Sequence, residues 1–141
     1  MKFPGVATTA AGILLVLAAL CVPCKASSSP EAGEAAGIRI GALMLSVNGN
    51  MIDMRYRVVA LETAQKTMHP KSSIYLIDQA SGTKLATPVA AKVGKLRQLP
   101  HPSATGRWQA MLFQNPGRMV KRGGKVTLVI DELRFEDLVI Q

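Results

Sequence analysis

Cysteine is nearly absent from this chain, and its two cysteines, Cys21 and Cys24, both lie close to the start. Their spacing is that of a redox or metal pair, but they end an apolar run instead of following a strand. That run, residues 11–22, is shorter than the roughly 20 apolar residues that span a bilayer and has the length of a signal-peptide core. We therefore expect a signal peptide over residues 1–26, a thiol-free periplasmic or secreted protein, and no membrane span after cleavage. The alternative is lipidation of Cys21.

Histidines and aromatic residues are also scarce. The sequence has two histidines, His69 and His101, and one tryptophan, Trp108. General acid–base catalysis needs titratable groups that converge, and the chain has neither a nucleophile-elbow motif nor a phosphate-loop spacing. Nucleic-acid surfaces need several exposed aromatic rings. The sequence therefore predicts neither an enzyme nor a nucleic-acid-binding protein.

Acidic residues are missing from the long segment between Lys84 and Lys125, which holds nine basic residues. Such one-sided charge indicates a negatively charged partner, although a solvated surface is the simpler interpretation. We expect the loop 90–107 and the turn 118–125 to lie close together and to contact an acidic protein or an anionic envelope component. The predicted partner-binding residues are Lys92, Lys95, Arg97, Arg107, Arg118, Lys121 and Arg122.

Alternating apolar residues dominate the chain after a polar segment, residues 27–37, that we expect to be a flexible leader. The clearest pair of strands surrounds a tight turn at Val47-Asn48-Gly49-Asn50, where the Asn-Gly pair predicts a two-residue hairpin turn. The apolar phase shifts near Gly41 and again near Glu136-Asp137, and each shift predicts a β-bulge. Residues 61–71 suggest a helical turn that ends before a proline.

Further short strands follow at intervals typical of an all-β domain. We expect strands over 73–78, 84–89, 125–131 and 133–140, the second at a sheet edge because of Pro88. Residues 90–106 should be the longest irregular segment. The strand 107–114 is apolar on both faces and is therefore expected at the centre of a sheet.

Together these patterns predict one all-β domain over residues 38–141, an antiparallel immunoglobulin-like β-sandwich of about seven strands. Several short stretches, among them residues 75–78, 92–94, 111–113 and 115–118, resemble a group of small exported bacterial β-sandwich proteins of unknown function. The resemblance covers most of the predicted domain. It implies export and one compact domain, and it implies no activity and no site.

The predicted function is a non-enzymatic binding or accessory module of the bacterial cell envelope, without a cofactor. Copper binding or delivery is the alternative, because thioether and imidazole groups suit Cu(I). The candidate ligands are Met68 and His69, expected in one exposed loop, and His101, expected in another. Such a site requires the two loops to meet in space.

Overall fold

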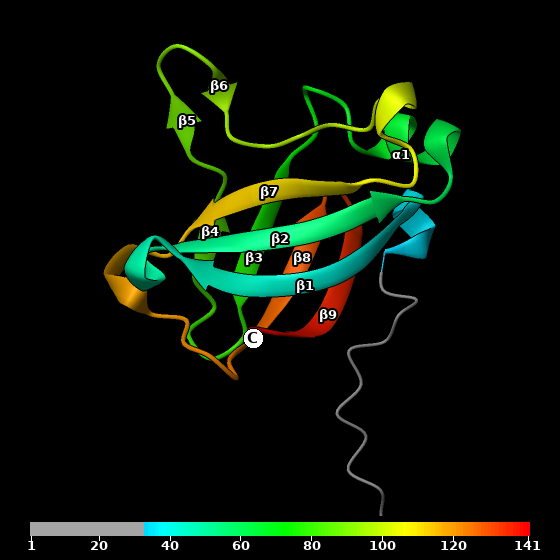
Figure 1. Cartoon of the computed structure of the whole chain (residues 1–141). Helices are drawn as coiled ribbons and strands as arrows, with labels where there is room; N and C mark the ends of the chain where they lie inside the picture. Colours follow the sequence, from blue (N-terminus) through cyan, green and yellow to red (C-terminus); the bar gives the residue numbers. More distant parts are fainter. Residues whose placement is uncertain (1–32) are drawn as a thin grey trace, which may run out of the picture.

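Two antiparallel sheets pack face to face in the computed structural model, which describes residues 33–141 (Figure 1). The predicted signal peptide and residues 27–32 of the leader lie outside the described residues. One sheet has the order β1 (Ile38–Ser46), β2 (Met51–Val58), β7 (Trp108–Gln114). The other has the order β4 (Lys84–Ala86), β3 (Ile74–Asp78), β8 (Lys125–Ile130), β9 (Leu133–Val139). The described part is therefore mostly β, as predicted.

The connections carry the remaining elements. A short hairpin of β5 (Val89–Ala90) and β6 (Gly94–Lys95) projects from the body of the molecule (Figure 1). The helix α1 (Leu61–Thr67) lies in the connection from β2 to β3, and it ends before Pro70 as predicted. Short 3-10 turns occupy Glu34–Ala36 (η1), Val47–Gly49 (η2), Pro102–Ala104 (η3) and Pro116–Arg118 (η4). No helix in residues 33–141 combines the length and apolarity needed to cross a membrane.

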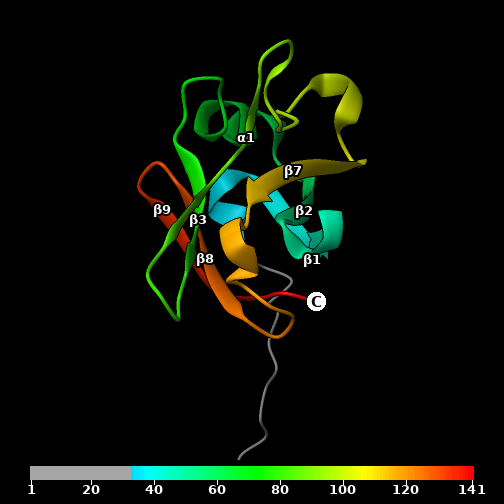
Figure 2. The ribbon, with the colours of Figure 1, turned by 90° about the vertical axis from the view of Figure 1, so that its left-hand side faces the viewer.

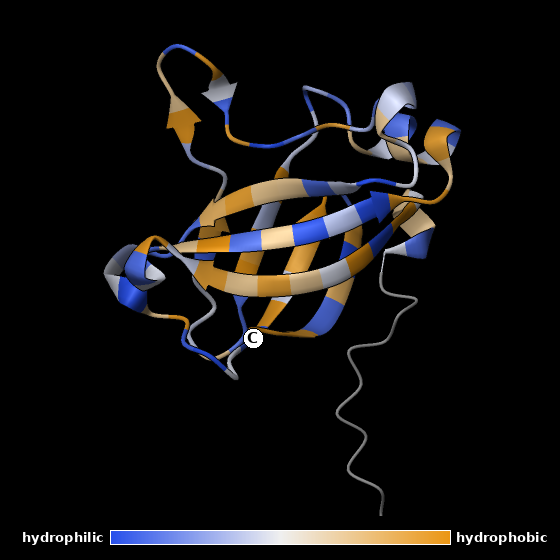
Figure 3. Ribbon diagram, in the orientation of Figure 1, coloured by the Kyte–Doolittle hydropathy of each residue, from blue (hydrophilic) through white to orange (hydrophobic). Residues whose placement is uncertain are grey.

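The core lies between the sheets and follows the alternation of the strands. In β2, the residues Ile52, Met54, Tyr56 and Val58 are buried, while Arg55 and Arg57 face solvent. Figure 3 shows this alternation as bands of opposite hydropathy along β2. By contrast, every residue of β8 from Val126 to Ile130 is buried.

Both predicted bulges are confirmed. The pairing of β1 with β2 shifts between Ile40 and Ala42, which leaves Gly41 as the extra residue. In β9, Phe135 pairs with Leu128 and Leu138 with Val126, so Glu136 and Asp137 together oppose a single residue. A bulge at each place lets the apolar side chains on both sides of it face the core.

Two local predictions were wrong. The strand β7 lies at the edge of its sheet and not at its centre. Its second apolar face is half-buried because residues 96–98 run along its outer edge, where Leu112 N donates to Leu96 O (3.1 Å) and Gln98 N to Ala110 O (3.0 Å). The hairpin turn lies at residues 47–50 as predicted, but its loop has four residues instead of two, because the pairing ends at Ser46 and Met51.

The two sheets are joined where the chain ends. Ile140 forms a parallel bridge with Leu43 of β1, and Gln141 N donates to Leu43 O at 2.8 Å. The side chain of Ile140 is buried in the core. At the other end of the described chain, Ala36 of η1 is fully buried, so packed structure begins before Ile38.

Candidate functional site

Arg97 differs from the other predicted partner-binding residues because its guanidinium group is engaged within the protein. It donates to the carbonyl oxygens of Ser72 (3.0 Å), Pro70 (2.8 Å) and His69 (3.3 Å). Burial lowers the pKa of Arg97, and the nearby carboxylate of Asp131 opposes this shift. Arg97 therefore fastens the 96–98 segment to the α1–β3 connection.

The other six predicted residues are exposed, and none forms an ion pair with the described residues. They do not form one patch. Lys92 and Lys95 belong to the β5–β6 hairpin, and Arg107 precedes β7. Arg118, Lys121 and Arg122 lie in the β7–β8 connection, which Figures 1 and 2 place well away from the hairpin. The expectation that the two basic segments lie close together was therefore wrong.

The three candidate copper ligands do not converge. Met68, expected in an exposed loop, is 1% exposed and packs in the core. His69 and His101 are exposed, and each uses Nδ1 locally: His69 accepts from Lys71 N at 3.1 Å, and His101 accepts from Ser103 N at 3.3 Å. Figure 2 shows η3, which follows His101, at the same end of the molecule as α1 but to one side of it. Within residues 33–141, no three His, Cys, Asp or Glu side chains cluster as metal ligands.

Trp108 is a large aromatic residue that is exposed and yet packed against its neighbours. Its side chain lies on the outer face of the β1-β2-β7 sheet and is 48% exposed. The guanidinium carbon of Arg57, its partner on β2, lies 4.1 Å from the ring centroid. The ring also covers Gly41, where an added Cβ would come within 2.3 Å of the indole. Gly41, the extra residue of the β1 bulge, therefore leaves room for the ring.

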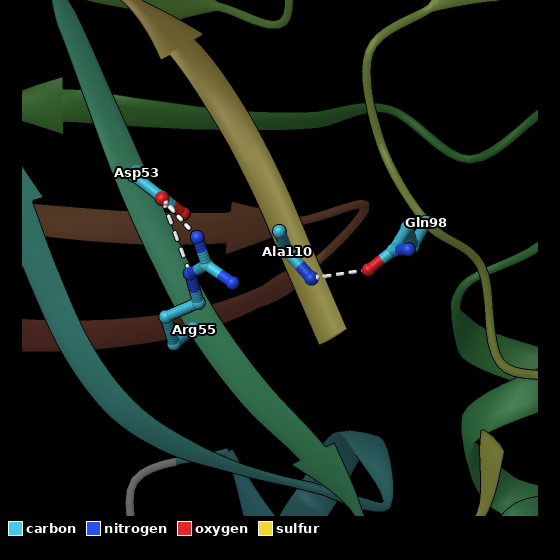
Figure 4. Close-up of polar contacts among 4 residues, drawn as sticks. All are labelled: Asp53, Arg55, Gln98 and Ala110. Carbon is cyan, nitrogen blue, oxygen red and sulfur yellow. Dashed lines mark hydrogen bonds and ion pairs between the residues drawn. The ribbon is translucent and has the colours of Figure 1, made fainter. Parts of the chain in front are cut away.

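The next row of the same face is formed by Ala42, Arg55 and Ala110, which are neighbours across the three strands. Arg55 is held by Asp53, whose Oδ2 accepts from Nε (3.1 Å) and Nη2 (2.6 Å). The third guanidinium nitrogen of Arg55 forms no hydrogen bond with the described residues, and Figure 4 shows it on the side of Ala110. Arg55 is thus oriented but keeps donors free.

Among the described residues, three surface hollows adjoin β7. The first, of about 410 Å³, is lined by Gly41, Ala42, Arg55 and Trp108. The second, of about 430 Å³, lies on the η3 side and includes Trp108, Arg107, His101 and Ser103. The third, of about 350 Å³, includes Ala110, Leu112, Lys95 and Val93. We call the residues named for these three hollows, together with Arg57, the β7 surface.

A hydrogen-bond network that starts at the buried Tyr56 supports the β7 surface from behind. The hydroxyl of Tyr56 donates to the carbonyl oxygen of Gln98 and lies 3.2 Å from Oε1 of Gln109. Gln98 Oε1 in turn accepts from Ala110 N at 2.6 Å (Figure 4). Burial raises the pKa of Tyr56, and the charge of Arg97 opposes that shift. This network ties the 96–98 segment to β7 and fixes the wall of the third hollow.

Sequence reasoning identified Lys95 and Arg107 of the β7 surface but not Arg55, Arg57 or Gly41. The outward positions of Arg55 and Arg57 were visible in the alternation of β2. The approach of Trp108 to Gly41 was not visible, because it depends on the register of three strands. Comparisons of the chain with protein-family models, with curated proteins and with solved structures found no match.

Proposed function

We propose that this chain is an exported, non-enzymatic binding or accessory module of the bacterial cell envelope. It contacts an acidic protein or an anionic envelope component through basic side chains. The β7 surface is the part of the molecule that best suits this role. It brings Lys95 and Arg107 together with Arg55 and Arg57 around three hollows.

The charge balance of the β7 surface is the observation that supports this proposal. Lys95, Arg57 and Arg107 form no ion pair with the described residues. Arg55 is the member of this surface that has a carboxylate partner, Asp53. Cations left without counter-charges around a concave surface attract an anionic partner and increase its rate of association.

We also propose that the sandwich is immunoglobulin-like. When the seven strands of the two larger sheets are lettered A to G in chain order, the sheets read A-B-E and D-C-F-G. The constant-type immunoglobulin arrangement is A-B-E-D and C-F-G. The two differ only in the sheet to which the fourth strand, β4, belongs. In this arrangement the β7 surface includes part of the open face of the three-stranded sheet.

Retention of envelope components by immobilised protein tests the functional proposal. The wild-type protein should retain acidic components of a bacterial envelope extract at low salt and release them at about 0.5 M NaCl, where the screening length is only a few ångströms. The double variant Lys95→Glu/Arg107→Glu should lose retention at low salt. The matched variant Lys121→Glu/Arg122→Glu carries the same charge change away from the β7 surface and should keep it.

Two results would contradict this function. Retention that persists at high salt would exclude a mainly electrostatic contact. Equal losses in the two double variants would show that net charge, and not the β7 surface, controls retention. Circular dichroism of each variant checks that its fold is intact.

A further inference from the structure

We infer that the β7 surface binds an acidic polysaccharide, with a hexuronic acid ring lying against Trp108 and its carboxylate on Arg55. This inference rests on the proposed function and names the chemical class of its anionic partner. Three features carry it: a flat apolar wall, oriented guanidinium groups beside that wall, and hollows on both sides of it.

The wall is the indole of Trp108. About half of this side chain is exposed, yet the ring is held in place by Arg57 at 4.1 Å and by its contact with Gly41. An immobilised aromatic ring loses little conformational entropy on binding. A pyranose ring presents a flat face of C–H bonds that packs against such a surface, whose π-electrons favour the positive edges of those bonds.

The charge beside the wall selects a carboxylate. Arg55 lines the same hollow as Trp108, and its two bonds to Asp53 hold the guanidinium group in one orientation. A guanidinium group binds a carboxylate through paired hydrogen bonds and so recognises its planar shape. Arg57 lies over the ring and Arg107 lines the second hollow with it, so both add positive charge beside Trp108. A neutral sugar would leave these cations without counter-charges.

The arrangement of the hollows indicates a polymer and not a single sugar. Trp108 separates a hollow on the sheet face from one at η3, and each has a basic residue, Arg55 in the first and Arg107 in the second. The second hollow also contains Ser103 and His101, whose polar atoms suit sugar hydroxyl groups. Consecutive acidic rings on either side of the indole would use both hollows. Small side chains at Ala42 and Ala110 leave room for a chain that crosses the strands.

Titration with oligogalacturonate tests the inference, because Trp108 is the only tryptophan in the sequence and reports on its own surroundings. The oligosaccharide should change the tryptophan emission and saturate. Its methyl ester, which has the same rings without charge, should bind about tenfold or more weakly, a loss of about 1.4 kcal/mol or more. Oligoglutamate and an oligothymidylate of similar charge test a peptide and a nucleic acid as alternative partners.

Variants locate the site by calorimetry. Trp108→Leu and Arg55→Gln should each weaken oligogalacturonate binding about tenfold or more, whereas Arg122→Gln, on the β7–β8 connection, should not change it. Gly41→Ala keeps every binding group but displaces the ring and should also weaken binding. Thermal unfolding of each variant separates loss of binding from loss of fold.

Several outcomes would overturn the inference. These are equal binding of the acid and its ester, equal or tighter binding of oligoglutamate or oligothymidylate, and wild-type affinity in folded Trp108→Leu. Salt-sensitive retention of envelope components without oligogalacturonate binding would refute the inference and leave the proposed function standing. If both double variants kept that retention, the proposed function itself would be refuted.

Discussion

At the scale of single residues, Tyr56 links stability to alkaline pH. Its side chain is fully buried, and burial raises the pKa of its hydroxyl above the ordinary value of about 10. The unfolded chain therefore loses this proton at a lower pH than the native protein does. The stability that Tyr56 contributes is complete below pH 10 and is lost as pH rises beyond it.

Urea unfolding at several pH values between 8 and about 11.5 measures this effect. Above pH 10, the free energy of unfolding should fall by up to about 1.4 kcal/mol per pH unit through Tyr56 alone. Tyr56→Phe should remove this component, although the loss of its hydrogen bonds lowers stability by about 1 kcal/mol at every pH. Tyr75→Phe should retain the alkaline fall. The same slope in Tyr56→Phe as in the wild type would contradict the assignment.

At the scale of elements, the 96–98 segment protects the edge of β7 and depends on Arg97. Arg97→Gln removes three hydrogen bonds to carbonyl oxygens, at a cost of about 1–3 kcal/mol. The loss should loosen the segment before the domain unfolds. Amide hydrogen exchange should then rise roughly tenfold or more at Ala110 and Leu112, whose N–H groups bond to this segment.

Exchange in β8 should stay unchanged in Arg97→Gln, because its partners β3 and β9 do not contact the 96–98 segment through hydrogen bonds. Lys92→Gln, on the exposed hairpin, is the matched control and should leave Ala110 and Leu112 protected. Unaltered exchange at both amides in Arg97→Gln would show that the segment holds to β7 without the arginine.

The elements also show how far the sequence predicts this fold. Period-two alternation predicted β2, and the phase shifts at Gly41 and Glu136 predicted both bulges, because each is a local property of one strand. The position of β7 was not predictable in this way. Its outer edge is covered by a non-repetitive segment held through the side chains of Arg97 and Gln98, and such contacts leave no periodic pattern. The contact of the Trp108 ring with Gly41 likewise joins strands that are distant in sequence.

At the scale of the whole molecule, the C-terminal residues connect the two sheets. Ile140 is 1% exposed, bridges to Leu43 of β1 and exchanges backbone hydrogen bonds with Gly123 and Gly124. Ile140→Ala should lower the free energy of unfolding by about 2–5 kcal/mol, the range for large-to-small changes in a packed core. Val139→Ala, at the more exposed neighbouring position, should cost less than about 1 kcal/mol.

Chemical denaturation followed by circular dichroism measures both changes, and a single cooperative transition in each variant makes the comparison valid. Similar costs for Ile140→Ala and Val139→Ala would show that the C-terminal bridge does not contribute to the stability of the sandwich.

The covered edge of β7 has a consequence for the manner of recognition. Leu96 and Gln98 already use the hydrogen-bonding groups of Ala110 and Leu112 along this edge. A ligand cannot attach there by extending the sheet as an added strand. Selectivity on this side of the molecule must then arise from the shape and charge of the ligand's substituents, and a partner's ability to adopt an extended backbone gives it no advantage.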